Sequence, residues 1–194
     1  VLAWACAAAV LAQPALPGLS AALASPAPDL SHCTAGERVQ FSCRLGAKTV
    51  SLCAAGAGDA GTLSYRYGRI GQVELAHTAD GKPERRFLAA SLPLQPGAEV
   101  QQIWFSRGDT RYLLAVCVGG RCPQDAVLAV LRAGRVISRQ VCQASPASAA
   151  WFAQDVVQFG NSTDNSHANA RLVELADYDN ALGQVFISRS TPLR

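Results

Sequence analysis

The chain has 194 residues, of which 49% are hydrophobic and 16% are charged, and its formal net charge is +3. A chain of this length and apolar content can bury a core of its own, which excludes a globally disordered protein. The charge is mild, and no basic stripe is interleaved with aromatic residues, so we expect no nucleic-acid partner. These features predict one globular domain, with or without an appendage.

The first 24 residues have the pattern of a secretory leader. They carry no charge, begin with a short apolar run, and end in the small-x-small sequence Ala22-Leu23-Ala24. A membrane anchor needs about 20 unbroken apolar residues, and Pro14 and Pro17 interrupt this run. We therefore predict a signal peptide at residues 1–24, no membrane span, and a periplasmic or secreted protein.

Composition divides the rest of the chain into three parts. Residues 25–38 begin with a Pro-rich stretch and are expected to be a mobile lead-in. Residues 39–142 are predicted to form the disulfide-stapled domain. Residues 143–194 are expected to be a linker and a C-terminal extension of mixed structure. This extension contains Trp151 and Phe152, which are costly to leave in water, so we expect it to pack on the domain or on a partner.

Short apolar segments separated by turns fill the region from Val39 to Val141. Several alternate with a period of two, several are rich in β-branched and aromatic residues, and no long helical pattern lies between them, which favours an antiparallel sheet. The predicted fold is all-β, an antiparallel sandwich or small barrel. The predicted strands are Val39–Cys43, Thr49–Cys53, Leu63–Tyr67, Gln72–Ala76, Phe87–Leu92, Val100–Ser106, Arg111–Val118, Ala126–Leu131 and Arg135–Val141.

In the C-terminal extension, residues 170–182 place three apolar side chains on one face of a possible helix. These are Leu172, Leu175 and Ala176. Val185–Ile187 could form a last strand.

An even number of cysteines follows the leader, namely Cys33, Cys43, Cys53, Cys117, Cys122 and Cys142. In an exported protein this predicts three disulfides, although six cysteines allow 15 pairings. Our preferred pairing joins Cys43 to Cys53 across a predicted hairpin and Cys117 to Cys122 across a tight glycine loop, which leaves Cys33 for Cys142. A metal site would favour Cys-x-x-Cys knuckles or regularly spaced histidines. None is present, so we expect neither a metal nor a cofactor.

Residues that could carry out catalysis are sparse. The three histidines, His32, His77 and His167, lie in no recognisable catalytic motif, and the sequence has no Gly-x-Ser-x-Gly. We interpret these histidines as ordinary surface residues. No two carboxylates form an obvious acid–base pair, although such pairs often come from distant strands. The sequence therefore favours a protein that is not an enzyme.

Two segments are candidate binding surfaces. Tyr65-Arg66-Tyr67 places two tyrosines on one face of a strand, where they form either a core ladder or an aromatic surface for a partner. Residues 106–112 are predicted to form a hairpin turn with polar side chains at its tip. The candidate binding residues are Ser106, Arg107, Asp109, Arg111 and Tyr112 from the turn and Tyr65, Arg66 and Tyr67 from the strand.

A resemblance covers the region from Phe41 to Cys142. It is carried by Phe41-Ser42-Cys43, Leu63-Ser64-Tyr65-Arg66-Tyr67-Gly68, the 106–112 segment and the closing Cys142. The pattern resembles small secreted proteobacterial β proteins and, more distantly, is similar to the membrane-bound C-type lysozyme inhibitor family. That family implies a small β-barrel and a Ser/Gly/Tyr loop that enters a lysozyme cleft. The chain departs from it in having six cysteines after the leader, a long extension and no lysine in the loop.

The resemblance implies an exported binding or inhibitory protein whose partner is a cell-wall hydrolase of lysozyme type. Ser106 and a guanidinium from Arg107 or Arg111 would bind the two carboxylates of the hydrolase cleft. The alternative is an envelope structural module that docks a partner through its C-terminal extension.

Overall fold

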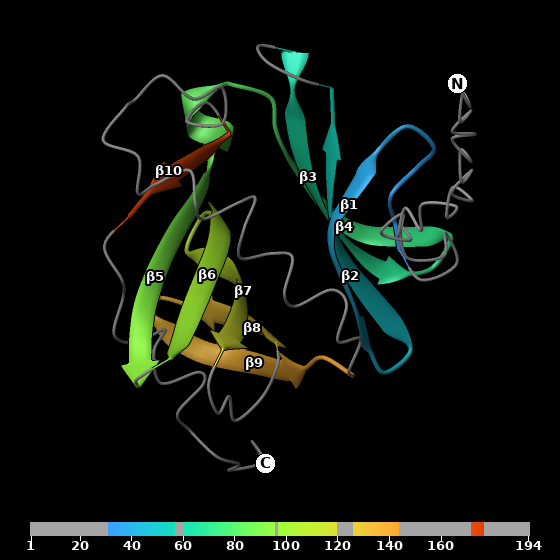
Figure 1. Cartoon of the computed structure of the whole chain (residues 1–194). Helices are drawn as coiled ribbons and strands as arrows, with labels where there is room; N and C mark the ends of the chain where they lie inside the picture. The colour runs from blue at the N-terminus through green and yellow to red at the C-terminus, as the bar shows by residue number, and fades with distance from the viewer. Residues whose placement is uncertain (1–30, 57–59, 96, 120–125, 144–171, 177–194) are drawn as a thin grey trace, which may run out of the picture.

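The computed structural model describes residues 31–56, 60–95, 97–119, 126–143 and 172–176 (Figure 1). The predicted leader, Trp151, Phe152, His167 and the possible strand at 185–187 lie outside these residues. The described residues are almost entirely strands and turns, and a short 3-10 turn, η3, lies at Pro83–Arg85. The prediction of an all-β fold is confirmed. No helix in this part of the chain is long and apolar enough to cross a membrane.

Two sheets build the fold, and Figure 1 shows them on opposite sides of the molecule. The first has the antiparallel order β1-β2-β3-β4, and in the second the strands β5 to β9 follow one another in chain order. Every strand predicted between Val39 and Val141 is present, because short turns separate the apolar segments. The strands are β1 (Arg38–Leu45), β2 (Lys48–Ala55), β3 (Thr62–Arg69), β4 (Gln72–Ala79), β5 (Phe87–Gln95), β6 (Ala98–Arg107), β7 (Thr110–Gly119), β8 (Ala126–Arg132) and β9 (Arg135–Val141).

The main core lies between the two sheets. Phe41 and Leu52 of the first sheet belong to the same buried cluster as Ile103 and Leu114 of the second. Alternation along each strand directs one set of side chains inward. Among the described residues, one isolated bridge, between Arg44 and Gln143, pairs the chain after β9 with β1. The arrangement is therefore sandwich-like rather than a closed barrel.

The six-stranded sheet also has a second buried cluster on its opposite face. Val100 and Trp104 of β6 belong to it, together with Leu113 of β7 and Val127 of β8. Strands that are buried on both faces need apolar side chains at consecutive positions. This requirement explains the unbroken apolar run from Leu113 to Cys117, which alternation alone would not produce.

The prediction of a helical face at residues 170–182 is wrong where the structure describes it. Val173–Leu175 forms strand β10, which pairs with β5 in parallel. The amide of Phe87 donates to the carbonyl of Leu172, and the amide of Ala176 donates to the carbonyl of Ala89, both at 2.9 Å. The open edge of β5 thus satisfies the backbone of this segment, and tertiary pairing overrides the local helical pattern.

The predicted pairing of Cys43 with Cys53 is wrong. The turn between β1 and β2 is centred on Gly46 and Ala47, so Cys43 lies opposite Val50. Cys53 is three residues farther along β2, and an odd offset turns its side chain to the other face of the sheet. Mirrored positions for the two cysteines would have required a turn centred on Lys48.

The predicted pairing of Cys33 with Cys142 is wrong for the same reason. Cys33 instead bonds to Cys53, at a sequence separation of 20, and Cys43 bonds to Cys142, at a separation of 99. The first bridge holds the segment before β1 against the outer face of β2. The second joins the end of β9 to β1 and so ties the two sheets together. Cys117 is also disulfide-bonded, and its predicted partner, Cys122, lies outside the described residues.

The two bridges should contribute unequally to stability. In the chain-entropy model, opening the loop of separation 99 costs about 5 kcal/mol of unfolding free energy, and opening the loop of separation 20 costs about 3 kcal/mol. We expect the Cys43→Ser/Cys142→Ser variant to be less stable in urea denaturation than the Cys33→Ser/Cys53→Ser variant. The reverse order would contradict the view that Cys43–Cys142 is the main link between the sheets.

Candidate binding site

The end of the β6–β7 hairpin is the most exposed of the predicted binding segments. Ser106, Arg107 and Asp109 are exposed, whereas Thr110 is buried. Arg107 pairs with Thr110 across a tight turn, in which Gly108 has a φ of +56°. That left-handed conformation is accessible to glycine at little cost. The sequence therefore produces a narrow tip at the end of two long strands.

Several hydrogen bonds fix this tip in place. The hydroxyl of Thr110 donates to Oδ1 of Asp109 at 3.1 Å. The amide of Ala133, in the turn between β8 and β9, donates to the Asp109 carbonyl at 3.1 Å. On the other side, Nη2 of Arg107 donates to the carbonyl of Ala76 in β4. The tip is thus bonded to a neighbouring turn of its own sheet and to the opposite sheet.

A stack of aromatic rings supports the tip from below. The ring of Phe105 stacks on His77 at a centroid distance of 4.2 Å and on Tyr112 at 5.0 Å. Tyr65 and Phe87 meet the Phe105 ring edge-on at 5.0 and 5.8 Å. Stacked and edge-to-face contacts of this kind add to the stability gained from burial. Tyr112, a predicted binding residue, is half-buried, and part of its side chain packs against the core.

An open pocket of about 300 Å³ adjoins the stack. It is lined by three consecutive residues of β4, namely Ala76, His77 and Thr78, and by Arg85 and Arg107. Among the strands that the structure describes, β4 lies at the edge of its sheet and pairs with β3 alone. The pocket therefore lies between β4, η3 and the end of β6.

The charges around the pocket are mostly positive. Arg85 forms an ion pair with Asp80 at 2.9 Å, and in the described part of the chain no carboxylate lies within ion-pair distance of Arg107. Nε2 of His77 donates to the carbonyl of Arg85 at 2.9 Å. Burial is the main cause that lowers the pKa of His77, and the charges of Arg107 and Arg85 lower it further. The hydrogen bond to the Arg85 carbonyl and the charge of Asp80 raise the pKa, but the net shift is downward. The histidine is therefore neutral at pH 7.

The structure separates the other predicted binding group, Tyr65-Arg66-Tyr67. Tyr65 is only 2% exposed, and burial raises the pKa of its hydroxyl above the usual range. A partner cannot reach this ring, so the aromatic-surface interpretation is wrong for Tyr65, which is a core residue. Tyr67 points to the same face and packs against the core, while Arg66 points to the outer face, as alternation predicts.

Arg66 is held by the segment before β1. Its guanidinium donates to both carboxylate oxygens of Glu37, at 2.5 and 2.7 Å, and to the carbonyl of His32 at 3.0 Å. The bidentate bond from Arg66 is the main cause that lowers the pKa of Glu37 to about 2. Arg66 therefore clamps residues 32–37 to β3 and is not available as a free donor.

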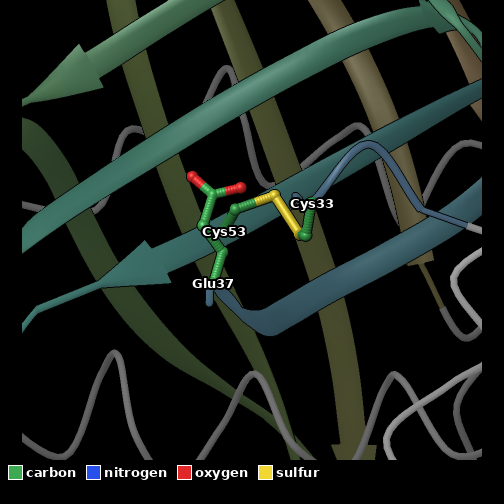
Figure 2. A group of neighbouring side chains, drawn as sticks. All are labelled: Cys33, Glu37 and Cys53. Carbon is green, nitrogen blue, oxygen red and sulfur yellow. A yellow bond between two sulfur atoms is a disulfide. The ribbon is translucent and has the colours of Figure 1, made fainter. Parts of the chain in front are cut away.

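Figure 2 shows the Glu37 carboxylate beside the Cys33–Cys53 disulfide. One ligand atom from each of these three residues lies within 4.8 Å of the others, a spacing that could suit a metal ion. However, the two sulfurs are bonded to each other, and Arg66 occupies both carboxylate oxygens. In this oxidised state the group acts as a structural clamp and lacks the free thiolates that a metal requires.

The interpretation of the histidines as surface residues is wrong for two of them. His32 is buried and bonds to β2 through its amide, which donates to Ser51 Oγ at 3.0 Å. His77 is half-buried in the aromatic stack. Alternation along β4 places His77 on the same face as Leu75 and Ala79, and this sequence signal could have indicated burial. No sequence signal connects Arg85 to His77 and Arg107.

Comparison of the whole chain with protein-family models, with curated proteins and with solved structures finds no match.

The Glu37–Arg66 clamp makes stability depend on pH. Because the pKa of Glu37 falls from 4.5 to about 2 on folding, its contribution is complete above pH 4.5 and is lost as pH falls towards 2. We expect Glu37→Gln to lower the unfolding free energy at pH 7 by roughly 2 kcal/mol. In urea denaturation the two proteins should converge near pH 2. A difference that stays constant with pH would refute this assignment.

Proposed function

We propose that this protein is an exported binding protein that inserts the end of its β6–β7 hairpin into an acidic cleft of a partner protein, a cell-wall hydrolase of lysozyme type. The main observation in support is that Ser106 and Arg107 are exposed at a tip whose backbone is fixed by hydrogen bonds. The disulfides of the fold agree with an oxidising, extracytoplasmic location.

The shape of the tip supports insertion into a cleft. Side chains alternate along each strand, so Ser106 points to one face of the hairpin and Arg107 to the other. Arg111 lies opposite Ser106 in the pairing of β6 with β7. The tip thus carries Ser106 and Arg111 on one face. Arg107 points to the other face, where its guanidinium is anchored to Ala76 of β4 and keeps further N–H donors for a partner.

The chemistry of the tip suits carboxylates. Hydrolases of lysozyme type carry a pair of carboxylates at the scissile bond. The guanidinium of Arg107 can donate two parallel hydrogen bonds to one carboxylate of the pair. The hydroxyl of Ser106 can donate one hydrogen bond to the other carboxylate. Because the tip is already ordered by its bonds to Ala76 and Ala133, binding costs little conformational entropy.

The alternative of docking through residues 143–194 receives less support. The described part of this extension is already used within the protein, because β10 pairs with β5 and the side chain of Leu172 is buried in the main core.

Inhibition should depend on the charges at the tip. In a turbidity assay with bacterial cells, a panel of lysozymes and micromolar protein, we expect inhibition of at least one enzyme. Arg107→Ala should weaken it about tenfold or more, because a charge-assisted hydrogen bond to a carboxylate is lost. Asp109→Asn should strengthen it, because the change removes a like charge and keeps the Oδ1 acceptor for Thr110.

The matched control is Arg69→Ala. Arg69 is an exposed arginine at the end of β3, and its removal changes the net charge by the same amount. This variant should inhibit like the unaltered protein. The proposal fails if no lysozyme is inhibited, or if Arg107→Ala and Arg69→Ala behave alike.

A further inference from the structure

We infer that the pocket between β4, η3 and the end of β6 is a binding site for a small molecule that carries one carboxylate. This site shares Arg107 with the hairpin tip, but its ligand is different and Ser106 and Asp109 do not line it. Two arginines and a histidine converge on it from three different elements.

The side chains of the pocket are held in position before any ligand arrives. The ring of His77 stacks on Phe105 and its Nε2 donates to the Arg85 carbonyl. The guanidinium of Arg85 is bonded to Asp80, and that of Arg107 to the carbonyl of Ala76. Each anchor uses only part of a guanidinium, which has five N–H donors. The remaining donors are available to an anion without a large loss of side-chain entropy.

The charge of the pocket selects the class of ligand. Asp80 neutralises Arg85, and His77 is neutral because burial and the two arginines lower its pKa. Only the charge of Arg107 remains uncompensated. A carboxylate, with a single negative charge, balances it, whereas a phosphate dianion would leave one negative charge without a partner in the pocket.

The size of the pocket indicates more than a simple ion. Its volume of about 300 Å³ lies at the lower end of the range for small-molecule sites. The ligand is therefore an organic acid of the size of a monosaccharide or an amino acid. Among the described strands, none pairs with the edge of β4 beside the pocket.

Titration of the intact protein with small acids tests the inference. The probes are glucuronate, N-acetylglutamate amide and inorganic phosphate, at about pH 8, where phosphate is mainly a dianion. The readout is the NMR signal of the His77 ring, assigned with the variant His77→Gln. We expect at least one carboxylate to shift this signal and to bind more tightly than phosphate. The tighter of the two carboxylates shows whether the site prefers a sugar acid or an acidic side chain.

Variants separate the pocket from the general charge of the surface. Arg107→Ala should weaken the binding of the tightest carboxylate about tenfold. Arg107→Lys should weaken this binding less, and Arg69→Ala should leave it unchanged. Far-UV circular dichroism checks that each variant is folded. A bound carboxylate should also raise the pKa of His77, because its negative charge offsets the positive charges of Arg107 and Arg85. Asp80 already raises this pKa in the protein without ligand. Binding should therefore strengthen as pH falls towards 6.

Three results would overturn the inference. The first is the absence of any shift with either carboxylate at about 50 mM, because a dissociation constant above this concentration is weaker than that of a specific small-ligand site. The second is tighter binding of phosphate than of either carboxylate. The third is equal carboxylate binding by Arg107→Ala and Arg69→Ala. The turbidity assay and this titration share Arg107, but they measure the binding of different ligands. Inhibition of a lysozyme without carboxylate binding would reject the pocket alone, and carboxylate binding without inhibition would reject the tip alone.

Discussion

The contact on which the structure depends is the stack of rings around Phe105. Phe105 belongs to the six-stranded sheet, and its ring meets His77 and Tyr65 of the four-stranded sheet as well as Tyr112 and Phe87 of its own. A side chain with neighbours from both layers fixes the distance and the angle between them. The Cys43–Cys142 bridge adds a covalent link between the same two layers.

The site is a direct result of this contact. Phe105 is two residues before Arg107, so the ring that anchors β6 in the core also determines where the guanidinium leaves it. The same ring holds His77 flat against the core at the edge of β4. The hairpin tip and the pocket therefore share one support. A change at Phe105 would therefore displace the guanidinium of Arg107 and the ring of His77 together.

The strands and the fold class could be predicted from the sequence because they follow from local rules. Alternation, apolar runs and glycine turns specified each strand from β1 to β9, and the tip at Gly108 followed from the turn between two of them. The disulfide pairing could not be predicted, because it depends on the register. A shift of the β1–β2 register by one residue reverses which face of β2 carries Cys53.

The remaining differences come from contacts between distant parts of the chain. Leu172, Leu175 and Ala176 follow a helical pattern, yet Val173–Leu175 pairs with the edge of β5 as a strand. Arg66 was predicted to contact a partner, and Glu37, 29 residues earlier, holds it instead. Arg85 reaches the pocket only because the turn after β4 folds back. Sequence spacing contains none of this information.

The separation of 99 residues between Cys43 and Cys142 has a consequence for the response to proteolysis. These two residues enclose both the β6–β7 tip and most of the sandwich within one covalent ring. A protease that cuts the exposed backbone at Gly108 opens the ring but releases no fragment, because the sulfur bridge still joins the two pieces. The paired strands on either side keep the cut ends in register, so a nicked molecule retains its mass, apart from one added water, and its core.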